Sequence, residues 1–423
     1  MTNSVGLLSI EFQKRNTTTV GIIILMSILL HQSFVIFGLN VSLSDFFCVL
    51  VLFLFAIHDK LVFPVKYILF FLLLSVYLLV NTIFIVPATI SYYPAADTIA
   101  SNFVKLLIVF GYFVLGYCLA KQELFDYVIK WYSIFGLIIG CLGIIMTFLN
   151  IAILSDVFFY GGRFKGLMND PNYYAILQVT ALAIAIRKLT NKKYKPIVWI
   201  VVFLAVSISG SKTGMITFVA YLIIHYFEII VRKKKKRIRD AILFCAAIAV
   251  LFLLMPYITS LINNTLEKIA TVIPIFARIE VLFSDFITAI SDKGSARDIA
   301  WNNAINLIAL APLLGIGIGT YSGLANMMFG SNIIAHNTYL QLAVEWGVPL
   351  TILFLSYVFY LLGRTFFSKY EEIPVNHLII RDVIVVLLIA SFAISLNNAR
   401  MFWLFLGSFV FYTNRYIRKK KAN

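Results

Sequence analysis

The sequence predicts an all-α, polytopic integral membrane protein that crosses the membrane about twelve times. Composition is the first reason: 61% of the 423 residues are hydrophobic, 13% are charged, and the mean hydropathy is +0.94. A soluble domain of this length needs a polar surface that such a composition cannot supply. The second reason is that the apolar residues form long unbroken runs, whereas membrane β-strands show an alternating pattern. We therefore expect residues 1–423 to form one membrane domain.

The expected spans follow from length, because an apolar helix of about 20 residues crosses the hydrocarbon core of a bilayer. In chain order they are 20–38, 43–57, 65–86, 98–120, 128–149, 173–187, 196–211, 213–231, 241–262, 338–362, 378–396 and 400–417. The second and sixth are short, and only four residues, Ser209-Gly210-Ser211-Lys212, separate the seventh from the eighth. The polar start, 1–19, leads into the first span without a small-residue cleavage site, which predicts an uncleaved first helix rather than a signal peptide.

Basic residues set the expected orientation. The net charge is +16, but if both termini are cytoplasmic, 26 of the 35 Lys and Arg residues fall in cytoplasmic segments, in line with the positive-inside rule. The basic run 232–237 is then an orientation signal near anionic lipid rather than a nucleic-acid site. We expect a multi-pass protein with both termini in the cytoplasm and no nucleic-acid partner.

The four cysteines point to neither disulfides nor zinc. Cys48, Cys118, Cys141 and Cys245 all fall inside expected spans, where a thiol is a small buried apolar group. No CxxC spacing is present in the sequence.

Residues 263–337 form the one long stretch without a spanning hydrophobic run, and we expect a helical outer loop between the ninth and tenth spans. Ser295 begins a helix with Asp298 three residues on, a capping-box arrangement, and the helix continues through 299–310 until Pro312.

Glycines then turn the chain at Gly315, Gly317 and Gly319, and the loop ends at His336, where the next span begins. This turn is expected to bring Arg297 and His336 together at one membrane face. The loop 263–337 is therefore the candidate active site.

Nine basic residues lie outside the cytoplasmic segments and carry the most information about function. A charge at the centre of a membrane helix costs about 2.5–3.5 kcal/mol on insertion scales, so each needs a structural partner or an anionic ligand. These residues are Lys105, Arg163, Lys165, Lys212, Lys268, Arg278, Lys293, Arg297 and Arg400.

Two short outer segments offer groups that bind anions. In 161–172, glycines allow close backbone approach and Arg163 supplies planar donors suited to phosphate; the alternative is a turn whose arginine only extends to the interface. Asp170-Pro171 predicts a helix start in this segment. Lys212 stands at another expected helix start, where free backbone N–H groups add to the ammonium. The spacing around Lys212 is not that of a nucleotide-binding phosphate loop.

Three arginines of the later chain are further candidates. Arg278 lies in an amphipathic stretch, where it either pairs with a neighbouring acid or binds the ligand. Arg297 occupies the first turn of the expected helix that Ser295 caps, close in sequence to the glycine turn, which favours ligand binding. Arg400 comes between the last two spans and completes a basic cup if it faces outward.

His336 is the candidate for acid–base chemistry, because the unperturbed pKa of histidine lies nearest neutrality. It takes a proton from an attacking hydroxyl, donates to a bound phosphate, or is a hydrogen-bonded structural residue. Glu345 follows nine residues later and either orients His336 or bonds within the bundle.

Four motifs, in this order, resemble the landmarks of the O-antigen ligase and Wzy-type polysaccharide polymerase superfamily. They are Arg163…Gly166…Asn169-Asp170-Pro171-Asn172, Ser209-Gly210-Ser211-Lys212-Thr213-Gly214, Arg297…Trp301…Pro312-Leu313-Leu314-Gly315-Ile316-Gly317 and His336-Asn337-Thr338-Tyr339-Leu340-Gln341…Glu345-Trp346-Gly347. The resemblance covers about residues 160–350, and the first five spans match only in hydropathy. Lys212 stands where many relatives carry arginine, which keeps the charge but loses the bidentate geometry.

The resemblance implies a C-type glycosyltransferase-like fold in the bacterial inner membrane, active on its extracytoplasmic face without metal or cofactor. The implied reaction polymerises lipid-linked oligosaccharide repeat units into O-antigen or capsular polysaccharide, by inverting glycosyl transfer from a polyprenyl-diphosphate donor such as undecaprenyl diphosphate. Membrane lipids and a chain-length regulator protein are implied partners. His336 and Arg297 are the implied catalytic residues, and the implied diphosphate or glycan contacts are Arg163, Lys165, Lys212, Arg278, Arg400, Asn337 and Glu345.

Protein cations fit this chemistry, because breaking the bond between the anomeric carbon and phosphate builds negative charge on the leaving diphosphate. Such a leaving group needs no general acid. Only the incoming hydroxyl needs a base, for which His336 is the first choice. The sequence carries no acidic pair with metal-ligand spacing on the expected outer face, which disfavours a divalent-ion mechanism.

Two alternatives stay open at this stage. A ligase of the same superfamily passes the chain to a lipid A core instead of a lipid-linked repeat unit, and one sequence does not reveal the acceptor. A flippase or transporter of lipid-linked sugars predicts charges spread through the bundle interior, whereas the informative charges here are expected on the outer face.

Overall fold

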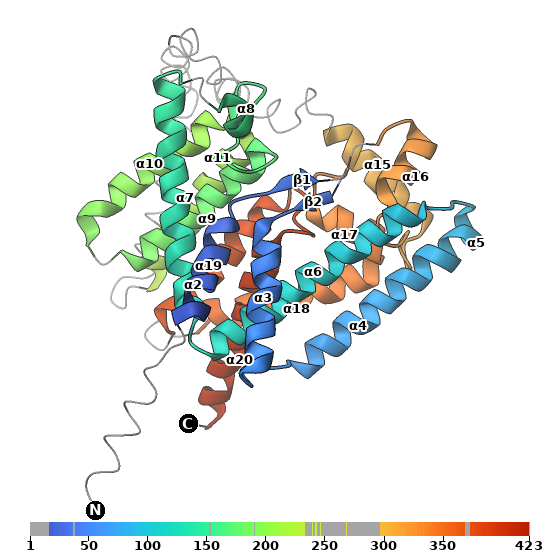
Figure 1. Ribbon diagram of the computed structural model, residues 1–423, viewed down its shortest axis with the longest axis horizontal. Coiled ribbons are helices and arrows are strands. Elements are labelled where there is room, and N and C mark those ends of the chain that lie inside the picture. Colours follow the sequence, from blue (N-terminus) through green and yellow to red (C-terminus); the bar gives the residue numbers. More distant parts are fainter. Residues whose placement is uncertain are drawn as a thin grey trace, which may run out of the picture.

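The computed structural model of the protein (Figure 1) describes residues 17–36, 39–151, 154–189, 191–232, 297–332, 334–368 and 373–422, with the single residues 239, 242, 246 and 268. Over these residues the chain is built of helices, apart from two short antiparallel hairpins, and the helical fold class is confirmed. Most of the expected ninth span, 241–262, lies outside the described residues, as do Arg278 and Ser295.

The described elements fall into three groups along the chain. The first group is α2 (Thr17–Leu29), β1 (Phe34–Ile36), β2 (Leu39–Val41), α3 (Leu43–Ile57), α4 (Val65–Val80), the π-helical turn η1 (Asn81–Ile85), α5 (Val86–Ile90), α6 (Ala96–Lys121) and α7 (Phe125–Phe148). The second is α8 (Ser155–Phe158), β3 (Phe159–Tyr160), β4 (Arg163–Phe164), α9 (Pro171–Lys188), the 3-10 turn η2 (Lys192–Tyr194), α10 (Lys195–Ile208) and α11 (Lys212–Arg232). The third is α15 (Arg297–Leu310), α16 (Tyr321–Phe329), α17 (Thr338–Trp346), α18 (Val348–Phe366), α19 (Val375–Ala390) and α20 (Arg400–Ala422).

Figure 1 shows α7, α9, α10 and α11 gathered on one side of the bundle and α4, α6 and α18 on the other. The helices α15 and α16 lie on the side of α4, α6 and α18, at one end of it. Within the described residues, five segments are long and apolar enough to cross a membrane, namely Val65–Ile90, Ala96–Lys121, Phe125–Phe148, Lys212–Ile230 and Val348–Phe366. Shorter apolar helices are Thr17–Leu29, Leu43–Ile57 and Lys195–Ile208. These segments agree with a polytopic membrane protein, and the total of twelve spans stays a prediction.

The first expected span, 20–38, is shorter in the structure, because α2 ends at Leu29 and the chain turns into the antiparallel β1–β2 hairpin. Three buried polar residues follow α2. The His31 ring bonds to a carbonyl of α7 at 2.9 Å, Gln32 accepts the first N–H of α3 at 2.9 Å, and the Ser33 N–H donates at 3.0 Å to the segment before α9. These polar residues can be buried because neighbouring elements supply their hydrogen bonds, and the first helix ends before them.

The tenth expected span, 338–362, is divided at Gly347 into α17 and α18. The predicted glycine bend packs against this break, where the N–H groups of Ile316 and Gly317 donate to carbonyls of α17 at 2.8 and 3.1 Å. Gly347 has φ +82°, and a Cβ there would lie 2.4 Å from the carbonyl oxygen of Leu313. Only glycine fits such a close approach with a positive φ.

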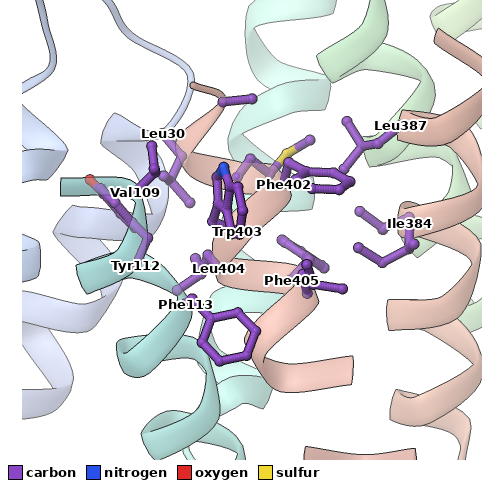
Figure 2. Close-up of a cluster of buried hydrophobic side chains, with 14 of the residues drawn as sticks. Leu30, Val109, Tyr112, Phe113, Ile384, Leu387, Phe402, Trp403, Leu404 and Phe405 are labelled. Carbon is purple, nitrogen blue, oxygen red and sulfur yellow. The ribbon is translucent and has the colours of Figure 1, made fainter. Parts of the chain in front are cut away.

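The core is packed most closely between α6 and α20, where glycines let the two backbones touch. A Cβ at Gly116 would lie 1.9 Å from the carbonyl oxygen of Leu404, and one at Gly407 would lie 2.0 Å from that of Phe113. Figure 2 shows Trp403 of α20 next to Val109 and Tyr112 of α6, and its ring also packs against Phe71 of α4, Phe110 of α6 and Phe354 of α18. This packing fixes the first turn of α20.

The cysteines only partly match the expectation of buried thiols. Cys48 and Cys118 are buried, but Cys141 is exposed on α7. It shares its face of the helix with the exposed residues Ile138 and Ile145, so this is an outward apolar surface of the kind that contacts lipid. Cys245 lies outside the described residues.

A buried ion network joins α9, α11 and α19, toward the ends of these helices that lie far from the candidate site. Arg187 donates to Glu228 at 2.5 Å and to Asp382 at 2.8 Å, and Arg381 donates to the same two carboxylates at 2.5 and 2.6 Å. The sequence places both arginines among the cytoplasmic charges; their side chains are buried rather than solvated, and the orientation stays a prediction. Two cations and two anions cancel, which makes their burial tolerable.

Breaking this network is expected to destabilise the bundle strongly. Arg381→Met leaves two buried carboxylates short of a partner, and we expect a loss of about 3–5 kcal/mol. The control is Arg415→Ala, because Arg415 and Glu123 form an exposed pair at 3.5 Å and such pairs contribute about 0–1 kcal/mol. Thermal unfolding of both variants in detergent compares the two. Equal, small losses would show that the buried network does not hold the helices together.

Candidate active site

Arg163 is held at the meeting point of two helices. It lies in the β3–β4 hairpin, whose turn is formed by Gly161 and Gly162 with positive φ. Its Nε donates to the carbonyl oxygen of Ser209 at 2.8 Å, and its Nη2 donates to Oδ1 of Asn172 at 3.0 Å. The guanidinium thus bridges the α10–α11 turn and the first turn of α9. Lys165 follows on the same hairpin and is half-buried.

The start of α9 is built as predicted. Asp170 is its N-cap, accepts the N–H of Asn172 at 2.8 Å, and precedes Pro171 in the first turn. The same Asp170 oxygen accepts from the Asn172 side chain at 3.0 Å. Asp170 therefore orients the amide that holds Arg163.

Lys212 and Arg297 meet at the break between α10 and α11, which falls at Ser209–Ser211 as the sequence predicts. Lys212 is the first residue of α11 and is half-buried. Arg297 is the first residue of α15, and its Nη2 donates to Oγ1 of Thr213 at 3.1 Å. Arg163 and Arg297, which are far apart in the chain, are thus attached to one short turn.

His336 lies in the field of Arg297 and Asp170. It has φ +46°, a left-handed conformation that side chains other than glycine rarely adopt, and it is half-buried. Burial lowers its pKa below the ordinary value of 6.5, the charge of Arg297 lowers the pKa further, and the carboxylate of Asp170 raises it in part. His336 is therefore neutral at pH 7, the form that accepts a proton.

Asn337 caps the N-terminus of α17. Its Oδ1 accepts the N–H groups of Tyr339 and Leu340 at 2.9 and 3.1 Å, as the N-cap of α17. Its Nδ2 donates to the carbonyl oxygen of Phe392 at 3.1 Å. These bonds give Asn337 a structural role, and its contact with diphosphate or glycan stays a prediction.

Arg400, the first residue of α20, is bound by a carboxylate. Its Nε and Nη2 donate to the two oxygens of Asp45 at 2.5 and 2.7 Å. Asp45 also accepts from the Tyr112 hydroxyl at 3.1 Å and closes a capping box at the start of α3. The charge that Arg400 was expected to add to a basic cup is therefore balanced by Asp45.

Glu345 faces a cavity of about 550 Å³ whose lining also includes Lys105 and Arg400. It lies in α17, before the candidate span of α18, and accepts from Gln341 at 2.6 Å. Burial raises its pKa to about 7, while the Gln341 bond and the charge of Lys105 act to lower it. Of the two roles left open for Glu345, the bond to Gln341 agrees with hydrogen bonding within the bundle, and the carboxylate that acts on the pKa of His336 is Asp170.

We call Arg163, Lys212 and Arg297 the cation cluster, and the neutral His336 lies in the field of Arg297. The sequence singled out each of these residues, but it did not identify Asp170 as the carboxylate that raises the pKa of His336, Asp45 as the partner of Arg400, or the interaction of Lys105 with Glu345. Asp170-Pro171 predicted the start of a helix, but this local pattern carries no information about which distant side chain the Asp170 carboxylate affects.

The comparison with known families bears on the same part of the chain. Residues 196–355 match the family described as O-antigen ligase. No curated protein matches the chain. The matched residues include Lys212, Arg297 and His336, while Arg163 is supplied by the hairpin before them. Residues 196–355 therefore carry an O-antigen ligase family domain, which supports the resemblance of the motifs to the O-antigen ligase and Wzy superfamily.

Proposed function

We propose that the protein polymerises lipid-linked oligosaccharide repeat units into O-antigen or capsular polysaccharide, by inverting glycosyl transfer from a polyprenyl-diphosphate donor. The observation that supports this most is the attachment of Arg163 and Arg297 to the single turn between α10 and α11, with His336 in the field of Arg297. Arg163, Lys212 and Arg297 come from three separate segments, and together they would offer a diphosphate several positive charges at one place.

In this proposal the acceptor hydroxyl oxygen attacks the anomeric carbon from the side opposite the diphosphate. The carbon–oxygen bond to phosphate breaks, its electron pair stays on the diphosphate, and the configuration at the anomeric carbon inverts. Arg163, Lys212 and Arg297 stabilise the charge that develops on the leaving group. His336 takes the hydroxyl proton, or alternatively donates to the diphosphate, and Asp170 favours the imidazolium that forms on proton transfer.

The donor chemistry sets the location. A polyprenyl tail lies in the bilayer and its diphosphate at the interface, so the cation cluster belongs at the extracytoplasmic surface of the bacterial inner membrane, with both termini in the cytoplasm. Arginine suits this site because its planar fork matches phosphate oxygens bidentately.

A ligase that passes the chain to a lipid A core is the second candidate, favoured by the family description of residues 196–355. The test supplies the purified protein in liposomes with lipid-linked repeat units, with and without lipid A core. A polymerase lengthens the chains in both mixtures. Product formed only when lipid A core is present would contradict polymerisation and establish the ligase.

A flippase predicts charges along a path through the bundle. The interior charges of α9, α11 and α19 are bonded to one another instead, because Arg187 and Arg381 each donate to Glu228 and Asp382. This set connects helices, and we assign it to stability rather than to transport.

A further inference from the structure

A cavity of about 550 Å³ shares no lining residue with the cation cluster. It opens between the start of α6, the helices α16 and α17, and the chain leading into α20. Its polar lining residues include Asn102, Gln341, Ser395, Asn397 and Asn398, and its aromatic ones are Tyr92 and Tyr321. Uncharged amides and hydroxyls beside aromatic faces are the groups that hold sugar rings.

Each cation on this cavity has a carboxylate of its own. Arg400 is bound through two hydrogen bonds to Asp45. Lys105 interacts electrostatically with Glu345 across the lining. A diphosphate entering here would have to displace the Asp45 carboxylate from Arg400 or lie close to that negative charge, which repels it. The cavity therefore suits an uncharged polar ligand better than an anion.

Two lining groups are left for such a ligand. Within the described residues, Oε1 of Gln341 and Oγ of Ser395 are buried atoms without a hydrogen-bond partner, and Gln341 is nine-tenths or more buried. A buried polar atom without a partner costs free energy, so a bound hydroxyl at these positions is favoured.

We propose that this cavity binds sugar rings of the glycan through their uncharged hydroxyls and is distinct from the diphosphate site. The inference rests on the proposed function, since it assigns the glycan its own binding site beside the cation cluster. The same sugars reach the protein from two sources, the growing chain or the incoming repeat unit, and the experiment separates them.

The test uses oligosaccharide repeat units released from the host's own polyprenyl carrier by mild acid, which removes lipid and diphosphate. Their binding to the full-length protein in nanodiscs is followed by saturation-transfer NMR. Ser395→Ala removes a hydroxyl that bonds to no described group, and we expect about tenfold weaker sugar binding with unchanged thermal stability. Thr98→Trp places a bulky ring on an exposed part of the lining and should block binding.

The matched control is Thr89→Trp, at an exposed threonine of α5 that does not line the cavity, and it should bind as the wild type does. Inorganic diphosphate should not displace the sugar from any of these proteins. Displacement by diphosphate, or wild-type binding by both Thr98→Trp and Ser395→Ala, would overturn the assignment.

Chain transfer by Thr98→Trp then identifies the source of the sugar. Recovery of the rate at high concentration of repeat unit assigns the cavity to the acceptor, and recovery at high concentration of preformed chain assigns it to the donor. Free-sugar binding is measured without transfer, so its absence contradicts the cavity assignment alone. Intact binding with no transfer by the wild-type protein contradicts the proposed function instead.

Discussion

Replacing His336 by alanine is expected to lower the rate of chain transfer by about 10²–10⁴-fold, the usual range for the loss of a general base. Folding and membrane insertion should be largely retained, because the side chain is only half-buried at the mouth of α17. Transfer of lipid-linked repeat units by the purified variant measures the effect. The control is His58→Ala, at an exposed histidine that ends α3.

The pH dependence separates the two roles of His336. Because its pKa is lowered from 6.5, the wild-type base is deprotonated at pH 7, and activity should fall only as the pH drops below that pKa. If His336 serves only as a base, raising the pH should partly rescue the alanine variant, since the acceptor hydroxyl then loses its proton to solvent. No rescue would favour diphosphate binding, and a wild-type rate for the variant would remove His336 from the mechanism.

Arg297→Lys should be nearly as damaging as Arg297→Ala. Losing a donor aimed at developing charge costs about 10²–10³-fold in rate. Lysine keeps the charge but presents a single ammonium in place of a planar fork, and it does not reproduce bidentate contact with the diphosphate while bonding Thr213. The rate of chain transfer at saturating donor is the measurement.

Arg415→Lys is the matched substitution, because Arg415 is an exposed arginine whose partner is Glu123. Its transfer rate should equal that of the wild type. Full activity in Arg297→Lys would make Arg297 a structural residue that only connects α15 to α11.

Local signals in the sequence predicted local structure well. Asp170-Pro171 predicted the start of α9, the break at Ser209–Ser211 separates α10 from α11, and the helix expected at 299–310 is α15. The three glycines after Pro312 form a turn with positive φ at each of them. In each case the residues that determine the feature are neighbours in the chain, so one sequence is enough to find it.

Contacts between distant segments were not predictable in the same way. Hydropathy did not reveal that Arg187 would be buried against carboxylates of α11 and α19, because the positive-inside rule treats every basic residue near a span as solvated. The split of the tenth span at Gly347 depends on the glycine bend that packs there. The electrostatic effect of Asp170 on His336 depends on how the start of α9 and the chain before α17, which are far apart in the sequence, are placed in the fold.

The proposal that protein cations, rather than a divalent metal, stabilise the leaving diphosphate can be tested in one reaction. Purified protein in liposomes is treated with chelator and given lipid-linked repeat units in metal-free buffer. We predict that it lengthens the chains at the rate of untreated protein, and that Arg163→Ala and Arg297→Ala lose this activity. A strict requirement for magnesium or manganese, with transfer restored when the metal is added back, would contradict the cation cluster as the source of catalysis.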